Sequence, residues 1–188
     1  IEGERALCFW LSQQTEVSLN HPDEKIKQEA SDYVSLMTPV VKSLFTDLAM
    51  EITSDAMQIH GGYGFTKDQG IEQLYRDNRI TPIYEGTNSV QAADLVFRKL
   101  SNKNGNIIGN FLNMIKSECE TNNEKVKNFS NQLTYHLDIL SKFTDWINDK
   151  NKTEKDDVSA AANDYLKALG FVSLAYSWLK VLEVSFKD

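Results

Sequence analysis

The chain has 188 residues, of which 41% are hydrophobic and 25% are charged, an ordinary composition for a globular protein. No hydrophobic run reaches the ~18 residues that a membrane-spanning helix needs, and the first residues, Ile1–Arg5, do not resemble a secretory signal. We therefore expect one large or two small domains, and neither a membrane span, a disordered chain nor a small disulfide scaffold.

The formal net charge is −7, and acidic side chains outnumber basic ones in both halves of the chain. Proteins that bind duplex nucleic acid normally carry a basic face, so we expect no nucleic-acid partner. The two cysteines, Cys8 and Cys119, lie far apart and have no histidine pair nearby. Since a zinc site needs about four ligands at short spacings, we predict no metal site, two reduced thiols and a cytoplasmic protein.

A hydrophobic period of 3.6 residues dominates the chain, and no segment shows the sustained alternation of a half-buried strand. We predict a first helix over about 2–19. A second helix is expected to begin near Glu24, with Asp23 as its N-cap. Pro39 interrupts the second pattern, which fits either two helices that meet at Thr38 and Pro39 or a single kinked helix.

Shorter elements are expected after this long pattern. The helical period ends at Gly61, and a short helix is predicted over Ile71–Asp77. An irregular segment follows. Asn88 and Gln91 then resemble the capping box of a helix that runs to about Leu100, and Thr87 can also cap this helix.

The polar stretch 101–106 is the candidate domain boundary, and three more helices are predicted beyond it. These helices are expected over 107–119, 126–147 and 158–186. Gly170 in the last of them permits close approach of another helix. We predict an all-α fold, with an up-and-down helical bundle over residues 1–103, incomplete at its N-terminus, and a second small helical domain over residues 104–188.

Five of the nine glycines lie between positions 61 and 86, which points to unusual backbone in one short region. The turn formed by Gly61, Gly62 and Gly64 suits a phosphate, but glycine is also the commonest residue after a helix C-terminus. Glu85 lies beside Gly86 before a helix start, where a carboxylate is either a general base or a residue stabilised by the helix dipole. Taken alone, each motif favours the structural interpretation.

Together, three segments match one known pattern in order and spacing. They are Gln58-Ile59-His60-Gly61-Gly62-Tyr63-Gly64-Phe65, Tyr75-Arg76-Asp77-Asn78-Arg79-Ile80 and Ile83-Tyr84-Glu85-Gly86-Thr87-Asn88. This pattern resembles the C-terminal helical domain of the acyl-CoA dehydrogenase family over roughly residues 1–100. Residues 161–178 resemble, more loosely, the helical domain appended to longer bacterial members, such as the 3-methylthiopropionyl-CoA dehydrogenase-like proteins.

The resemblance implies an FAD-dependent enzyme that converts an acyl-CoA thioester to a trans-2-enoyl-CoA. It implies that Glu85 is the catalytic base that removes the α-proton, that its backbone N–H donates to the thioester carbonyl, and that Gly86 lies beside the substrate. Contacts with FAD are implied for Gln58, Gly61, Gly62, Thr87 and Ser89.

The resemblance also implies partners. The segment of Gln58, Gly61 and Gly62 matches one that reaches the FAD of a neighbouring subunit, which implies a homo-oligomer, either a dimer or a tetramer. Electron-transfer flavoprotein is the implied electron acceptor. The acyl chain of the substrate is left open, and both sulfur-containing short acyl-CoAs and ordinary fatty acyl-CoAs fit.

The sequence departs from the family in its extent. A complete dehydrogenase has an N-terminal helical domain and a middle β-domain, and the 188 residues contain neither. We therefore expect a C-terminal fragment that supplies the base and half of the FAD site and is inactive by itself. An acyl-CoA oxidase fragment, a non-catalytic helical interaction module and a nucleic-acid-associated module of the same fold are the alternatives.

Overall fold

The computed structural model describes residues 1–100, 106–120 and 123–186. Every regular element within these ranges is helical, which confirms the predicted all-α class. The predicted domain boundary, between residues 103 and 104, lies outside the described residues.

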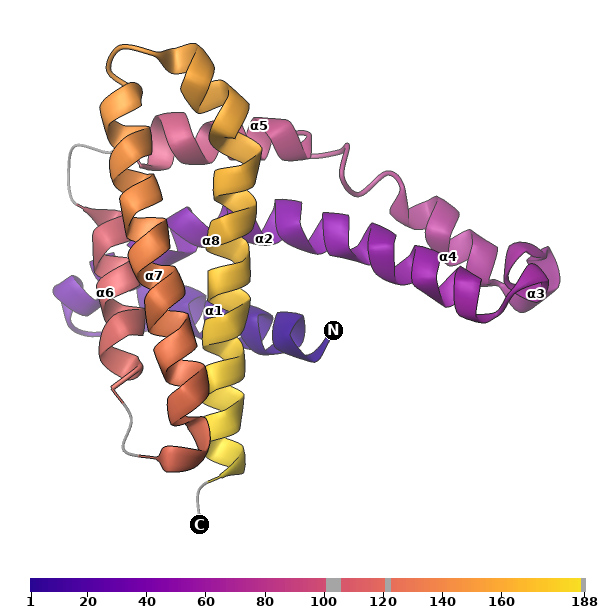
Figure 1. Cartoon of the computed structure of the whole chain (residues 1–188), viewed down its shortest axis with the longest axis horizontal. Coiled ribbons are helices and arrows are strands. Elements are labelled where there is room, and N and C mark those ends of the chain that lie inside the picture. Colours follow the sequence, from indigo (N-terminus) through magenta and orange to yellow (C-terminus); the bar gives the residue numbers. More distant parts are fainter. Residues whose placement is uncertain (101–105, 121–122, 187–188) are drawn as a thin grey trace.

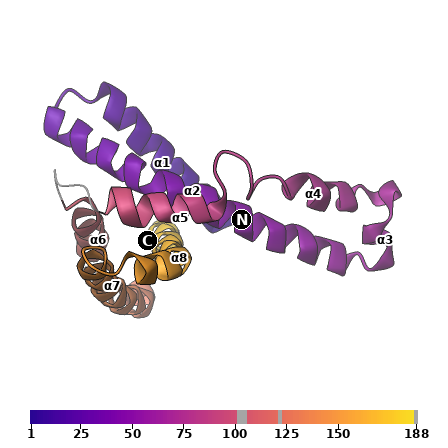
Figure 2. The same ribbon diagram turned by 90° about the horizontal axis from the view of Figure 1, so that it is seen from above.

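One layer of the molecule is formed by the helices before residue 100. Helices α1 (Glu2–Asn20) and α2 (Glu24–Ile59) are an antiparallel pair joined by a short turn, and α5 (Asn88–Asp94) packs beside α2 (Figures 1 and 2). The π-helical turn η2 (Leu95–Lys99) continues α5 and turns Leu95 and Val96 into the core. The predicted helix to about Leu100 is therefore present, but its last turn is π-helical rather than α-helical.

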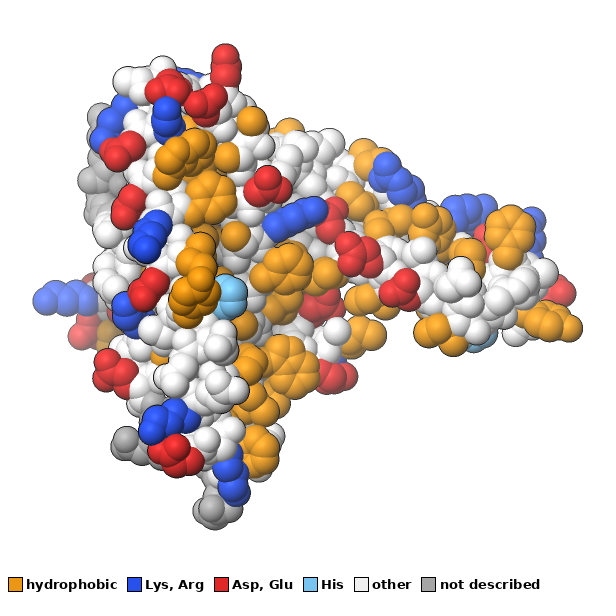
Figure 3. All heavy atoms as spheres, in the orientation of Figure 1, with side chains coloured by type: hydrophobic (Ala, Val, Ile, Leu, Met, Phe, Trp, Pro, Cys, Tyr) orange, Lys and Arg blue, Asp and Glu red, His pale blue; other side chains and the backbone are white. Residues whose placement is uncertain are grey.

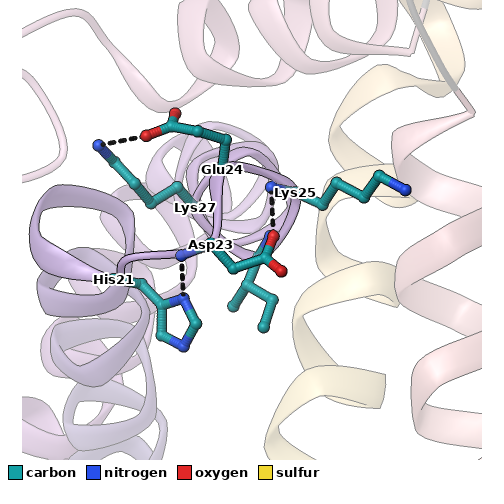
Figure 4. Close-up of polar contacts among 6 residues, drawn as sticks. His21, Asp23, Glu24, Lys25 and Lys27 are labelled. Carbon is teal, nitrogen blue, oxygen red and sulfur yellow. Dashed lines mark hydrogen bonds and ion pairs between the residues drawn. The ribbon is translucent and has the colours of Figure 1, made fainter.

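Asp23 caps α2 as predicted, because its side chain satisfies the first free N–H groups of the helix. Its Oδ1 accepts hydrogen bonds from the N–H groups of Lys25 (2.8 Å) and Ile26 (3.4 Å). His21 Nδ1 in turn accepts from the Asp23 N–H at 3.1 Å (Figure 4). The chain reversal between α1 and α2 is thus fixed by local hydrogen bonds.

Helix α2 passes through Pro39 without a break, so the single-helix alternative is right. Thr38 is not an N-cap, since its hydroxyl donates to the Val34 carbonyl at 2.7 Å inside the same helix. A proline inside a helix removes one hydrogen bond and costs about 3 kcal/mol. Burial of Pro39 together with Met37 and Val40 offsets this cost.

An arm formed by residues 50–79 projects from the first layer (Figures 1 and 2). It consists of the C-terminal turns of α2 and the short helices that pack back on them. These are α3 (Gly62–Phe65), the 3-10 turn η1 (Lys67–Gln69) and α4 (Ile71–Asn78), the last close to its predicted position. The arm carries the glycine turn at its tip.

Helices α6 (Ile107–Glu118), α7 (Glu124–Lys150) and α8 (Lys155–Ser185) form a second layer that runs across the first (Figure 1). Helix α7 is longer at both ends than the predicted 126–147. Its Asn123 side chain accepts from the Lys125 N–H at 3.0 Å and caps the extra N-terminal turn. The segment between α7 and α8 is correspondingly shorter than the predicted helix ranges imply, because α8 begins at Lys155.

The two layers share one hydrophobic core, because α8 packs on α1, α2 and α5 as well as on α7. Gly170 of α8 makes the predicted close approach, since a Cβ there would lie 2.7 Å from Leu44 Cδ2 of α2. Rings from four helices meet in the core, with centroid separations of 5.6–6.2 Å. They belong to Trp10, Tyr33, Phe111 and Tyr176.

Helix α8 is long and apolar enough by length and composition to cross a membrane. In the fold it behaves as a core helix, because Tyr165, Leu166, Leu169 and Leu179 are buried against neighbouring helices. Core helices meet the same length and hydropathy criteria as membrane spans. Of the most apolar 18-residue window of α8, 39% is buried within the fold.

Candidate functional site

The loop between α4 and α5 presents Glu85 at the root of the arm. We call residues 84–88 the Glu85 loop. Glu85 has φ of 57°, and among the described residues it is the one non-glycine residue with positive φ. A side chain with a Cβ is disfavoured in this left-handed region, and such strain is concentrated at functional sites. Gly86 follows with φ of 84°, which a residue without a Cβ adopts readily.

The loop is fixed by hydrogen bonds on the C-terminal side of Glu85. Gln91 Nε2 donates to the Glu85 carbonyl at 2.9 Å, and Lys42 Nζ of α2 donates to the Gly86 carbonyl at 2.8 Å. The Asn88 N–H donates to the Pro82 carbonyl at 3.2 Å and closes the loop. The peptide groups that follow Glu85 therefore have defined orientations, although the loop has no regular structure.

The predicted capping box of Asn88 and Gln91 is wrong. Thr87 is the N-cap of α5, and its Oγ1 accepts from the Val90 N–H at 3.4 Å. The Asn88 side chain turns to α2 instead, where Nδ2 donates to Asp47 Oδ1 at 2.7 Å and Oδ1 accepts from Lys42 Nζ at 2.8 Å. Sequence spacing alone did not distinguish these caps, because Thr87 and Asn88 are both good N-cap residues and the partners on α2 are distant in sequence.

The Glu85 carboxylate is exposed. The apolar surroundings expected of a general base are therefore not supplied by the described residues, and the large side chains on either side, Ile83, Tyr84 and Val90, are themselves exposed. The Glu85 N–H makes no hydrogen bond within the described part of the chain. Both groups are thus available to a molecule that covers this surface.

The tip of the arm holds the other predicted residues. Gly61 has φ of 58° and ψ of −146°, and its N–H donates to the Gln58 carbonyl at 3.0 Å to end α2. A Cβ at Gly61 or Gly62 would meet nothing within 4 Å, so this turn is open. Gly64 differs, because a Cβ there would lie 2.6 Å from the Met57 carbonyl oxygen. The turn is therefore both a helix end and an open backbone surface.

The predicted site residues form two groups rather than one. Residues 85–89 lie at the root of the arm beside Lys42, whereas Gln58, Gly61 and Gly62 lie at its tip (Figure 1). The turns of α2 between Lys42 and Ile59 separate them by about 25 Å, at 1.5 Å per residue. Lys42 escaped the sequence prediction, because its partners are 44 and 46 residues away and no local pattern connects them.

Apart from the Glu85 carboxylate, the predicted site residues offer a ligand neutral hydrogen-bonding groups. Thr87 and Ser89 are exposed and offer hydroxyls at the root of the arm, and Gln58 offers a carboxamide at the tip. Such groups suit the heteroatoms and phosphates of a dinucleotide. Among the described residues, no group of three His, Cys, Asp or Glu side chains is placed to hold a metal ion.

Two family models match the chain. "Acyl-CoA dehydrogenase, C-terminal domain" matches residues 23–100, and "Acetyl-CoA dehydrogenase C-terminal like" matches residues 111–188. The chain belongs to the acyl-CoA dehydrogenase family. Both the Glu85 loop and the glycine turn lie within the first matched range, and α6 from Phe111, α7 and α8 lie within the second.

Curated bacterial proteins that are similar in sequence are also named as acyl-CoA dehydrogenases. The chain is 41% identical over 118 residues to 3-methylmercaptopropionyl-CoA dehydrogenase of Ruegeria pomeroyi, which covers 61% of this chain and 19% of that protein. It is 32% identical over 105 residues to butyryl-CoA dehydrogenase of Syntrophomonas wolfei, which covers 56% of this chain and 17% of that protein. The chain thus spans about a fifth of the length of these relatives.

Solved structures show the same fold. ACDH-11 of Caenorhabditis elegans, solved in complex with C11-CoA, superposes with a TM-score of 0.73 at 24% identity and covers 95% of this chain and 32% of that chain. The apo form of Bd2924 superposes with a TM-score of 0.66 at 18% identity, and the match covers 96% of this chain and 30% of that chain. At these identities the likeness concerns the arrangement of the helices.

Proposed function

We propose that this chain is the C-terminal part of an FAD-dependent acyl-CoA dehydrogenase and supplies Glu85 as its catalytic base. The observation that carries the proposal is the Glu85 loop, where one residue at positive φ has an exposed carboxylate and an N–H without a partner among the described residues. Family membership supplies the reaction class. The curated relatives are named as dehydrogenases of acyl-CoA thioesters, which supports acyl-CoA as the substrate.

The chemistry explains why these groups belong together. The α-proton of a thioester is weakly acidic, so the Glu85 carboxylate must be held close to it. Charge develops on the thioester oxygen as the proton leaves, and the free Glu85 N–H can stabilise it by a hydrogen bond. Gly86 next to the base adopts φ of 84°, and a Cβ there would approach Gln91 Nε2 to 3.3 Å, so glycine suits this position of the loop. FAD, when bound, would supply the hydride acceptor that the α,β-dehydrogenation to a trans-2-enoyl-CoA requires.

The FAD-binding residues fall into the two groups described above. Thr87 and Ser89 would contact FAD at the root of the arm, next to the reacting centre. Gln58, Gly61 and Gly62 would contact it at the tip. The separation of about 25 Å along α2 supports two different FAD molecules for the two groups, the second one bound to a neighbouring subunit.

We therefore expect a homo-oligomer, a dimer or a tetramer, in which the arm contacts the neighbouring subunit. Exposed hydrophobic side chains gather on the arm, as Figure 3 shows. They include Ile59, Tyr63, Phe65 and Leu74. Exposed apolar patches of this kind mark interaction surfaces.

The remaining partners follow from the proposed reaction. Electron-transfer flavoprotein is the proposed electron acceptor, and the two free thiols, Cys8 and Cys119, support a cytoplasmic location. We expect the 188-residue chain to be inactive by itself, because it supplies only part of each FAD site.

Glu85→Gln in the full-length flavoprotein tests the proposal. Loss of the base should lower kcat by a factor of about 10²–10⁴, while FAD remains bound, because the change keeps the size of the side chain. Glu16→Gln, on the exposed face of α1, is the matched control and should leave kcat unchanged. Turnover that survives Glu85→Gln would refute the base assignment and favour a non-catalytic helical module.

A further inference from the structure

We propose that Lys42 is a positioning residue that fixes the Glu85 loop in its reactive conformation. The inference rests on the proposed role of Glu85 as the base and adds a residue that sequence patterns do not reveal. Lys42 lies on α2, and its ammonium group donates to the Gly86 carbonyl and to Asn88 Oδ1, both at 2.8 Å. One side chain thereby ties the residue after the base, and the start of α5, to the long helix.

The backbone of Glu85 makes such a tie necessary. Its φ of 57° is unfavourable for a residue with a Cβ, so an untethered loop would relax to negative φ. Such a rotation about φ would change the directions of both the carboxylate and the N–H of Glu85. Lys42 opposes it by holding the Gly86 carbonyl, while Gln91 Nε2 holds the Glu85 carbonyl at 2.9 Å.

The groups around Lys42 favour its hydrogen bonds to the Glu85 loop. Its two acceptors are neutral oxygens, a backbone carbonyl and a carboxamide, and no carboxylate pairs with its ammonium among the described residues. The carboxamide of Asn88 is itself fixed, since Nδ2 donates to Asp47 Oδ1 at 2.7 Å and to the Ser43 carbonyl at 3.2 Å. Lys42 is therefore held in a network that Asn88 connects back to Ser43 and Asp47 of α2.

The experiment compares Lys42→Met with Lys99→Met in the full-length flavoprotein. Lys42→Met keeps the length of the side chain and removes its donors. Lys99 Nζ makes a similar contact between helices, 2.7 Å from Ser35 Oγ, but away from the loop. Because small misplacements of reacting groups cost up to about a hundredfold, Lys42→Met should lower kcat at least about tenfold, with KM and FAD content nearly unchanged.

Two further readouts separate positioning from general stability. The primary isotope effect with α-dideuterated acyl-CoA should rise in Lys42→Met, because proton removal becomes the slowest step. Lys42→Arg, which keeps the charge and the donors, should recover most of kcat. Lys99→Met should stay within about twofold of the unchanged protein, as expected for a residue outside the reaction site.

The outcomes are distinct. A Lys42→Met protein with unchanged kcat, or one that loses FAD or unfolds while Lys99→Met does not, would overturn the positioning role. An equal loss in Lys42→Met and Lys42→Arg would also count against it. If Glu85→Gln abolishes turnover and Lys42→Met does not lower it, only this inference fails. If Glu85→Gln leaves turnover intact, the proposed function itself fails.

Discussion

Hydrogen bonds that span more than forty residues of sequence define the conformation of the Glu85 loop. The loop has no helix or strand to hold it, so its shape depends on side chains that reach it from elsewhere. Asn88 is central, because its carboxamide makes hydrogen bonds to Ser43, Thr46 and Asp47 of α2 and also accepts from Lys42. A partly buried amide held by this many hydrogen bonds specifies one arrangement and tolerates few alternatives.

Asn88→Ala should therefore destabilise the chain. Removal of the carboxamide leaves Lys42 and Asp47 without a shared partner, and an unmade hydrogen bond at a partly buried site costs about 1–3 kcal/mol. Urea denaturation of the chain should show a loss of that size in the free energy of unfolding. Asn131→Ala, on the exposed face of α7, should change it by less than about 0.5 kcal/mol. Equal effects of the two changes would contradict the network.

At the scale of elements, α2 unites the two groups of the proposed site. Its N-terminal half is part of the core, and its C-terminal half extends into the arm, so one rigid helix sets the distance between the Glu85 loop and the glycine turn. The helix remains unbroken at Pro39 because the surrounding core packs against it. Helices α3 and α4 are short and depend on α2 for their position.

The cap at Asp23 should contribute measurably to the stability of α2. Its side chain accepts two N–H hydrogen bonds at the helix start, and loss of an Asp N-cap costs about 1 kcal/mol. Asp23→Ala should lower the free energy of unfolding by this amount in urea denaturation. Asp55→Ala, on the exposed face of the same helix, is the matched control and should have no comparable effect. If both substitutions cost the same, the cap is not the cause.

At the scale of the whole molecule, α8 joins the two matched family regions into one core. Its buried tyrosines show how closely the layers are packed. Burial raises the pKa of Tyr165, whose hydroxyl lies 2.8 Å from Thr144 Oγ1. The pKa of Tyr176 is raised by burial and by the nearby Glu118 carboxylate, which accepts its hydroxyl at 3.0 Å. The folded protein therefore keeps both side chains in their neutral forms.

The raised tyrosine pKa values predict a loss of stability at alkaline pH. In the unfolded chain tyrosine ionises near pH 10, whereas Tyr165 and Tyr176 ionise at higher pH in the folded protein. Their stabilising contribution is thus complete below about pH 10 and declines as the pH rises further. Thermal unfolding between pH 8 and 11 measures this decline.

Tyr165→Phe should make the decline in Tm above about pH 10 less steep. The exposed Tyr135 provides the control, because Tyr135→Phe removes a tyrosine that is not buried. An alkaline decline that is equally steep in both variants and in the unchanged chain would assign the effect to other groups.

Most of the helices, the cap at Asp23 and the family were predictable from the sequence. Helical periodicity and the cap at Asp23 are local properties, so most helix positions were predicted within a few residues. The spacing from Gln58 to Asn88 was specific enough to indicate the family, and Glu85 with it. The assignments of Glu85, Gly86 and the FAD-binding residues remain predictions that the experiments above test.

Three features became clear from the packed fold: the unbroken path of α2 through Pro39, the cap at Thr87 in place of Asn88, and the contacts of Lys42. Each depends on partners that are distant in sequence: the packed core around Pro39, and the partners of Asn88 and Lys42, which lie 41–46 residues away along the chain. Local propensity offers two or more solutions at these positions. The choice between them is made by burial and by hydrogen bonds that exist only after the helices have packed.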